Sequence, residues 1–297
     1  MLQIHRHVPF PVTDKDLEDY VVAVANRLAF RTIKTYLAGI KFILTISGQD
    51  VTLLFQRRLH YILRGVRRSQ GLRFRRPRRI PLTLSHLRHL VNLAHSQLPQ
   101  ADTLCFTAAT LLAFFGLLRV SEFTTPSPTF FDANLHLGRA DISFSPSRTL
   151  AFVRIKASKT DPFREGCVIR LAATRIPGMC PVRALLQYTS GFPTLRGPLF
   201  VLSNGQFLTR QHINAFLRRA FPLALPGTIA SHSFRIGGAS RLCSLGVPDA
   251  TIMIMGRWAS NAFRRYLHLS DTHISRLHSL MADPGQTQED HTWDPDV

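Results

Sequence analysis

The sequence is poor in acidic residues. Its 297 residues include 18 Asp and Glu against 37 Lys and Arg, which gives a formal net charge of +19 at pH 7. Lysine is also scarce, because five of the basic residues are lysines and the others are arginines. An excess of positive charge this large is typical of proteins that bind a polyanion, either nucleic acid or an anionic membrane surface. It argues against a small acidic enzyme.

Cysteine is scarce as well, and the 4 cysteines are dispersed along the chain. Cys105, Cys167, Cys180 and Cys243 form no CxxC pair and match no cluster of histidines, so the sequence predicts neither a disulfide framework nor a zinc site. We expect free thiols in a reducing compartment, and no metal or other cofactor. Hydrophobic residues make up 45% of the chain, which is enough to form a sizeable core.

Long apolar segments are also missing. The short region before Thr13 has no apolar stretch of the kind found in signal peptides, and it is too short for a further domain. The longest mostly apolar stretch, residues 104–118, is too short to span a bilayer and is expected to form a buried helix. We therefore expect a nucleic-acid partner and no membrane association.

Helical periodicity dominates the N-terminal part of the chain. The spacing of apolar residues predicts helices over residues 13–28, 31–47 and 51–68, with Thr13 capping the first. Residues 71–81 then carry several arginines and two prolines without apolar periodicity, and we interpret them as a basic interdomain linker. The first domain is therefore expected to span residues 1–70.

The rest of the chain combines helices with a small sheet. Polarity partly alternates over residues 140–144, 150–156 and 167–171, and turns separate these segments, which predicts three antiparallel strands. We expect a second domain over residues 82–282 and a disordered polar tail over residues 283–297. The predicted fold class is mainly α with a small antiparallel β-sheet. Helices are expected at residues 85–96, 102–118, 181–189, 209–220, 233–245, 249–255, 259–267 and 271–281.

Two arginine patterns point to anion binding. Arg119 follows the apolar stretch, where a charge must be paired or must bind an anion, and Glu122 lies three residues later. A plain Arg119–Glu122 ion pair is the simpler alternative. His232 and Arg235 lie three residues apart at a predicted helix start, so they share a face near an end that favours anions. A capping or surface role is the alternative for this pair.

A lysine and a tyrosine complete the set of candidates. Lys159 lies in a tight turn between two predicted strands, and Lys156, at the end of the preceding strand, is its competitor. Tyr266 follows Trp258 and is the one tyrosine downstream of Arg235. Taken alone, the lysine fits a solvated turn, and the tyrosine fits a core residue with its hydroxyl in water.

In this order along the chain, these residues resemble the tyrosine recombinase family, which includes phage integrases and the Cre and Xer recombinases. The segments LAFFGLLRVSEF, VRIKASKTDPFREG, HSFRIGGAS and GRWASNAFRRYL are most similar to recombinases of eukaryotic mobile elements, the DIRS-like retrotransposons and Cryptons. Many bacterial members have Leu before and His after the second arginine, whereas Phe234 and Ile236 flank Arg235. The resemblance covers residues 13–281. It implies a helical core-binding domain followed by an α+β catalytic domain.

The resemblance also implies a reaction. Tyr266 would attack a DNA phosphodiester and form a 3′-phosphotyrosyl intermediate that rejoins without ATP or a metal. Arg119 and Arg235 would bind the non-bridging phosphate oxygens, for which two fork-shaped guanidiniums are better suited than lysines.

Four more residues receive roles from the same resemblance. Lys159 would protonate the leaving 5′-oxygen, and His232 would assist proton transfer. Trp258 would pack on the site and donate its indole N–H to phosphate, while Glu122 would support Arg119. Because the set looks complete, we expect an active enzyme.

The expected partner is double-stranded DNA, clamped between the two domains. The resemblance implies a homotetramer on two duplexes, and a chromosomal substrate implies a nuclear location. An apolar stripe of Ile274, Leu277, Leu280 and Met281 is expected to dock onto a neighbouring protomer or onto its own chain. The candidate DNA-contact residues are Arg31, Lys34, Arg64, Arg67, Arg68, Arg75 and Arg76.

Three other functions fit parts of the sequence. A type IB topoisomerase uses a similar catalytic set, although the helical first domain favours a recombinase. A catalytically silent DNA-binding protein derived from a mobile element would have the same composition. An RNA-binding protein is a third possibility, but no RRM or KH signature is present.

Overall fold

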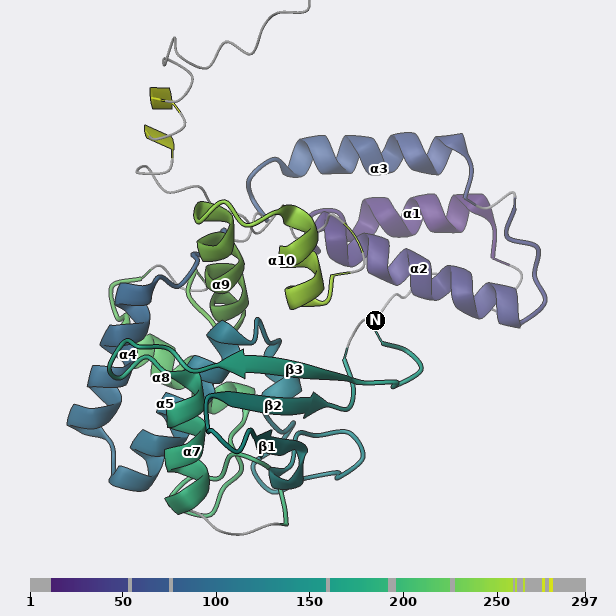
Figure 1. Cartoon of the computed structure of the whole chain (residues 1–297). Coiled ribbons are helices and arrows are strands. Elements are labelled where there is room, and N and C mark those ends of the chain that lie inside the picture. The colour runs from purple at the N-terminus through teal and green to yellow at the C-terminus, as the bar shows by residue number, and fades with distance from the viewer. Residues whose placement is uncertain are drawn as a thin grey trace, which may run out of the picture. The chain divides into compact units, whose positions relative to one another are not determined.

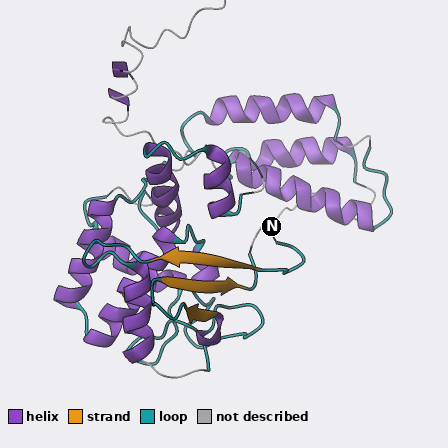
Figure 2. Cartoon of the chain, viewed as in Figure 1, coloured by secondary structure: helices purple, strands orange, loops and turns teal. Residues whose placement is uncertain are grey.

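The computed structural model describes residues 12–52, 55–74, 77–158, 161–191, 196–224, 228–258, 260, 264, 274–275 and 278–279. The chain divides into two compact units, Met1–Arg76 and Pro77–Val297. Figure 1 follows the elements along the chain, and Figure 2 shows that helices dominate both units. Fold class is therefore confirmed as mainly α with a small antiparallel sheet.

The first unit contains three helices, α1 (Asp14–Val24), α2 (Phe30–Ile46) and α3 (Arg57–Gln70). Helix α1 begins at a capping box, in which Asp16 N donates to Thr13 Oγ1 and Thr13 N donates to Asp16 Oδ2. Apolar residues at helical spacing from all three helices form one core. The buried core residues are Leu17, Val21, Val24, Ile33, Leu37, Leu44, Leu59 and Val66.

A buried glutamine joins the end of α3 to the connection between α1 and α2. Gln70 Oε1 accepts a hydrogen bond from Phe30 N at 2.8 Å, and Gln70 Nε2 donates to Ala25 O at 2.7 Å and to Leu28 O at 2.9 Å. The side chain thus satisfies backbone groups that neither helix can pair internally.

The predicted start of the third helix at residue 51 is wrong, because α3 begins at Arg57. Asp50 Oδ1 accepts from both Thr52 N and Thr52 Oγ1, at 2.8 and 2.5 Å. Such local side-chain hydrogen bonds compete with helix formation, and they hold this segment in a turn.

The second unit is built around α5 (Gln100–Phe115), in which every residue from Cys105 to Phe114 is buried. Helices α4 (Leu84–Gln97), α7 (Pro181–Gly191) and α9 (His232–Ser244) contact α5, and α8 (Arg210–Ala220) contacts α4. The long apolar stretch of the sequence is therefore a central core helix. No helix in the described part of the chain is long and apolar enough to cross a membrane.

A small antiparallel sheet covers part of this core, with the strand order β1 (Ile142–Phe144), β2 (Leu150–Ile155) and β3 (Cys167–Ala172). A 3-10 turn, Arg139–Asp141, precedes β1. Val153 pairs with Ile142 on one side and with Ile169 on the other. Ala151, Val153 and Ile155 are buried, as the alternating polarity predicts.

Two consecutive glycines let α9 approach the backbone of other segments. A Cβ on Gly237 would lie 2.0 Å from Leu82 O, and a Cβ on Gly238 would lie 2.6 Å from Phe114 O. Leu82 N also donates to Ser233 O at 3.1 Å, just after the segment expected to be a linker. Gly237 therefore lets α9 lie against Leu82, and Gly238 lets it lie against the end of α5.

The predicted extension of the apolar helix to residue 118 is wrong. Helix α5 ends at Phe115, Gly116 is its C-cap, and Leu117 adopts a left-handed conformation with φ of 49°. A short helix that we did not predict, α6 (Val120–Phe123), follows, and Arg119 is its N-cap residue. Further along the chain, α9 and α10 (Asp249–Gly256) agree with the predicted helices to within two residues. The helices predicted at 259–267 and 271–281 lie almost entirely outside the described residues.

Candidate active site

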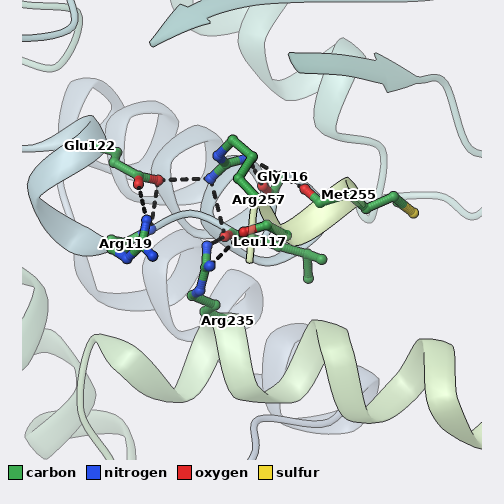
Figure 3. Close-up of polar contacts among 8 residues, drawn as sticks. Gly116, Leu117, Arg119, Glu122, Arg235, Met255 and Arg257 are labelled. Atoms are coloured by element: carbon green, nitrogen blue, oxygen red, sulfur yellow. Dashed lines mark hydrogen bonds and ion pairs between the residues drawn. The ribbon is translucent and has the colours of Figure 1, made fainter. Parts of the chain in front are cut away.

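Arg119 and Glu122 form the ion pair that the sequence predicted. Arg119 Nη1 donates to Glu122 Oε1 at 2.9 Å, and the backbone N–H of Arg119 donates to Glu122 Oε2, also at 2.9 Å. The Glu122 side chain is fully buried, whereas the Arg119 side chain is 17% exposed. Figure 3 shows the Arg119 guanidinium directed at the carboxylate. The pair is more than a surface contact, because a buried carboxylate requires close counter-charge.

Arg257 is a functional-site residue that the sequence analysis missed. Its Nη2 donates to Glu122 Oε2 at 2.8 Å, so Glu122 lies between two guanidiniums (Figure 3). Arg257 is the C-cap of α10 and has a left-handed backbone with φ of 55°. A basic residue at a helix C-terminus has an ordinary explanation in the helix dipole, so the sequence offered no signal for this contact.

Arg235 is buried next to the turn that contains Leu117, just after α5. Only 1% of the residue is exposed, and its two terminal nitrogens donate to Leu117 O and Gly256 O. Leu117 is left-handed, and its carbonyl oxygen accepts from Arg235 (Figure 3). The sequence placed Arg235 at the start of α9, and the structure brings it next to the segment that carries Arg119.

Trp258 covers the guanidinium of Arg235. The Arg235 Cζ atom lies 4.1 Å from the centroid of the Trp258 ring, which is a close cation–π contact. A Cβ on Gly256 would lie 1.7 Å from the indole ring, so only glycine allows the ring to fold back at this position. Gly256 thus contributes both a carbonyl acceptor and the space for the indole.

His232 is the first residue of α9, and its surroundings are cationic. Burial, together with the charges of Arg235, Arg119, Arg79 and Arg210, lowers the pKa of His232 to about 4. The imidazole is therefore neutral at pH 7 in the protein without DNA. A neutral ring both accepts and donates a hydrogen bond, which suits a group that assists proton transfer.

The two competing lysines differ in what the structure shows of them. Lys156 Nζ contacts Asp141 Oδ2 at 2.5 Å and donates to Ala133 O at 2.7 Å and His136 O at 3.3 Å, so its ammonium group is held beside the sheet. Lys159 lies outside the described residues. Its described neighbours Ser158 and Asp161 line a pocket of about 460 Å³ that Arg257 and Trp258 also line.

Tyr266 and most of the predicted apolar stripe also lie outside the described residues. Arg264, two residues before Tyr266, is described, and its Nε and Nη2 each bind Asp249 Oδ2 at 2.7 Å. This contact ties residue 264 to the first residue of α10. From the stripe, Ile274 is described and is partly exposed.

The predicted DNA-contact residues of the first unit are all exposed where the structure describes them. Arg64, Arg67 and Arg68 lie on α3, and Arg31 and Lys34 lie on α2. Arg75 and Arg76 lie outside the described residues. Among the described side chains, no group of three or more His, Cys, Asp or Glu could hold a metal ion.

The cluster is suited to binding a phosphate group. The guanidiniums of Arg119 and Arg257 contact the buried Glu122 carboxylate, and that of Arg235 binds Leu117 O nearby, so positive charge is in excess there (Figure 3). Among the described residues, Arg119 Nε and Nη2 bind no protein acceptor. A guanidinium fork oriented in this way can donate two hydrogen bonds to a phosphate.

Solved structures of similar fold are tyrosine recombinases. An XerH site-specific recombinase bound to palindromic difH substrate, in a post-cleavage complex, has a TM-score of 0.61 at 15% identity, covering 92% of this chain and 73% of that one. A Tn1549 transposon integrase in complex with transposon right-end DNA has a TM-score of 0.60 at 15% identity, covering 95% and 89%. A lambda integrase dimer bound to a COC′ core site has a TM-score of 0.53 at 15% identity, covering 87% and 65%. No protein-family model and no curated protein matches the sequence. The chain has the tyrosine recombinase fold.

Proposed function

We propose that this chain is a site-specific tyrosine recombinase or integrase of a eukaryotic mobile element, which cleaves and rejoins double-stranded DNA through a 3′-phosphotyrosyl intermediate. The main support is that two arginines from separate elements lie together in a chain with this fold. Arg119 follows the turn at Leu117, and Arg235 donates to the carbonyl oxygen of Leu117. The fold alone is compatible with several activities, so the proposal depends on these side chains.

The proposed reaction is a transesterification. The Tyr266 oxygen attacks phosphorus, the bond from phosphorus to the 5′-oxygen breaks, and the 3′-phosphate becomes joined to Tyr266. Lys159 supplies the proton that the leaving 5′-oxygen takes up. Arg119 and Arg235 stabilise the charge on the non-bridging oxygens, which grows in the transition state. Rejoining is the reverse reaction and conserves the energy of the bond.

The pKa of His232 would rise when DNA binds. The arginines around it favour the neutral imidazole, which lowers its pKa. A bound phosphate brings negative charge among the same groups, so the pKa of His232 rises toward its ordinary value. His232 is then able to accept the Tyr266 proton during the attack.

Arg235 requires a local rearrangement before it can contact DNA. It is 1% exposed, and the Trp258 ring lies over its guanidinium. A phosphate therefore reaches Arg235 only after the indole moves aside.

The first unit would supply much of the DNA affinity. Helix α3 contains no acidic residue and exposes Arg64, Arg67 and Arg68. Contacts from these residues to DNA phosphates release counterions and make binding steeply salt-dependent. By analogy with the family, we expect a homotetramer on two duplexes in the nucleus.

Covalent trapping tests the proposal directly. The protein is incubated with a pool of nicked suicide duplexes that carry candidate element ends or random sequence, and a denaturing gel shows any covalent protein–DNA band. We expect a band with the wild-type chain and no band with Tyr266→Phe. Absence of a band despite salt-sensitive DNA binding would favour a silent DNA-binding protein. Relaxation of supercoiled plasmid without a specific site would favour a type IB topoisomerase.

A further inference from the structure

Arg257 is a partly buried cation to which neither the sequence patterns nor the proposed reaction assigns a role. Its side chain is 16% exposed, and it comes from the end of α10, 135 residues from Glu122 in the sequence. Arg257 N donates to Ile254 O at 3.1 Å and closes the end of α10. The left-handed backbone of Arg257 stores strain, which persists only where the surrounding structure holds it.

Glu122 divides its two carboxylate oxygens between two arginines. Oε1 accepts from Arg119 Nη1 at 2.9 Å, whereas Oε2 accepts from Arg257 Nη2 at 2.8 Å. Arg119 therefore binds only one oxygen through its side chain and keeps its other N–H groups away from the carboxylate. If Arg257 were removed, the buried carboxylate would retain one counter-charge and would draw the whole Arg119 fork toward itself.

Arg257 also supports the turn that holds Arg235. Its Nη1 donates to Gly116 O at 3.3 Å and to Met255 O at 3.4 Å, and its Nη2 donates to Leu117 O at 3.4 Å. Leu117 O is also an acceptor for Arg235 (Figure 3). One guanidinium thus connects the turn after α5 to the end of α10, and the Arg257 Nε is buried without a partner among the described residues.

We infer that Arg257 is a positioning residue, which keeps Arg119 and Arg235 in the geometry needed to receive a DNA phosphate by bracing Glu122 and the Leu117 turn. The inference rests on the proposed function, because that function assigns phosphate to Arg119 and Arg235. Arg257 donates both terminal nitrogens to protein acceptors, and the inference gives it a supporting role without a contact to the phosphate.

The test compares Arg257→Met, Arg257→Lys, Glu122→Gln and the Arg257→Met/Glu122→Gln double variant with a matched control, Arg241→Gln. Arg241 is an exposed arginine near the end of α9. The substrate is the nicked duplex that wild-type protein captures from a randomised pool. Two quantities are measured: the rate of covalent capture at saturating duplex, and the Kd for the same duplex in a Tyr266→Phe background.

We expect Arg257→Met to slow capture by about 10- to 100-fold, because small misplacements of positioned groups have effects of this size. Its Kd should stay near the wild-type value, and Arg257→Lys should recover part of the rate. The double variant should be no slower than the slower single variant, because both changes remove the same ion pair between Arg257 and Glu122. Unchanged capture by Arg257→Met, additive losses, or a loss of affinity that accounts for the rate would overturn the inference.

A measurement without DNA separates this inference from the proposed function. In ¹⁵N-arginine NMR spectra, the guanidinium N–H signals of Arg235 should be protected from exchange in the wild type and lose protection in Arg257→Met, while those of Arg119 should gain protection as its fork turns to Glu122. If wild-type protein captures no DNA but this loss is seen, the proposed function fails and the positioning role stands. If protection is unchanged in Arg257→Met, the positioning role is wrong.

Discussion

The arginines of the two units differ in their burial and in their contacts. In the second unit, Arg119, Arg235 and Arg257 are largely buried and are held by Glu122 and by backbone carbonyls. In the first unit, Arg64 and Arg68 on α3 are exposed, and they interact with solvent. Protein contacts fix the orientation of the first group, whereas the second group places positive charge at the surface.

This difference determines which property each group can control. Buried guanidiniums with few alternative conformations can be matched to a transition state, because their orientation is set before the substrate arrives. Exposed arginines act through charge and counterion release, which depend little on orientation. Substitutions in the second unit should therefore change rate and folding, and substitutions in α3 should change affinity and its salt dependence.

The largest effect is expected from Arg235→Lys. A lysine keeps the charge but cannot reach both Leu117 O and Gly256 O or donate two parallel hydrogen bonds to phosphate. Loss of one donor to transition-state charge lowers rates by about 100- to 1,000-fold. Single-turnover capture of the nicked duplex should fall by this factor, while Kd in a Tyr266→Phe background changes little. An equal fall in affinity and rate would show that Arg235 acts through its charge, as the exposed arginines do.

Two glycine substitutions test the same contrast through folding. Gly237→Ala places a Cβ 2.0 Å from Leu82 O, a backbone atom, and should lower the free energy of unfolding by about 1–3 kcal/mol. Gly65→Ala on α3 has open space around it and should raise that free energy by up to about 1 kcal/mol, because alanine favours helix.

Urea denaturation can follow the two units separately. The 2 tryptophans, Trp258 and Trp293, both belong to the second unit, so their fluorescence reports on that unit, whereas circular dichroism reports on all helices. Gly237→Ala should move the fluorescence midpoint to lower urea. Gly65→Ala should leave the fluorescence midpoint in place. A fluorescence midpoint that is unchanged in Gly237→Ala would contradict the close approach of α9 to Leu82.

His232 makes the second unit sensitive to acid. Its pKa is lowered from 6.5 to about 4 in the folded protein, so the unfolded chain binds the proton more tightly between these values. The stability from the neutral ring is fully present above pH 6.5 and is lost as pH falls toward 4. At pH 5 the loss should be roughly 1–2 kcal/mol. His232→Gln should flatten this part of the pH profile in urea denaturation, while histidines such as His86 remain as the common background. An identical profile in both proteins would show that His232 is not the group responsible.

The sequence predicts the fold well where the signals are local. Helical spacing identifies α2, and alternating polarity identifies β2, because each pattern reflects one face packed on a core. Local rules fail where distant segments decide the conformation. Leu117, just after the end of α5 at Phe115, is left-handed, and its carbonyl oxygen accepts from Arg235, which lies 118 residues away.

The candidate site shows the same division. The contact between Arg119 and Glu122 is predictable from a spacing of three, because both lie in one short helical turn. The contact between Glu122 and Arg257 spans 135 residues and has no sequence pattern of its own. Gly237 and Gly256 are similarly unremarkable in the sequence, and their importance follows only from the backbone and the indole that lie against them.

The smallest effect per substituted residue is expected for the exposed arginines of α3. Replacing Arg64, Arg67 and Arg68 together with Gln removes exposed charge without touching the buried core of Leu59 and Val66. Each phosphate contact that is lost should reduce the slope of log K against log salt by about 0.9. Affinity for duplex should therefore weaken by about 8-fold per lost contact for each tenfold fall in salt below the concentration at which the two proteins converge, and capture at saturating DNA should keep its rate. Fluorescence anisotropy across a salt series measures the slope. A parallel shift with an unchanged slope would mean that these arginines do not contact phosphate, whereas a slower capture rate at saturation would mean that α3 also takes part in positioning the DNA.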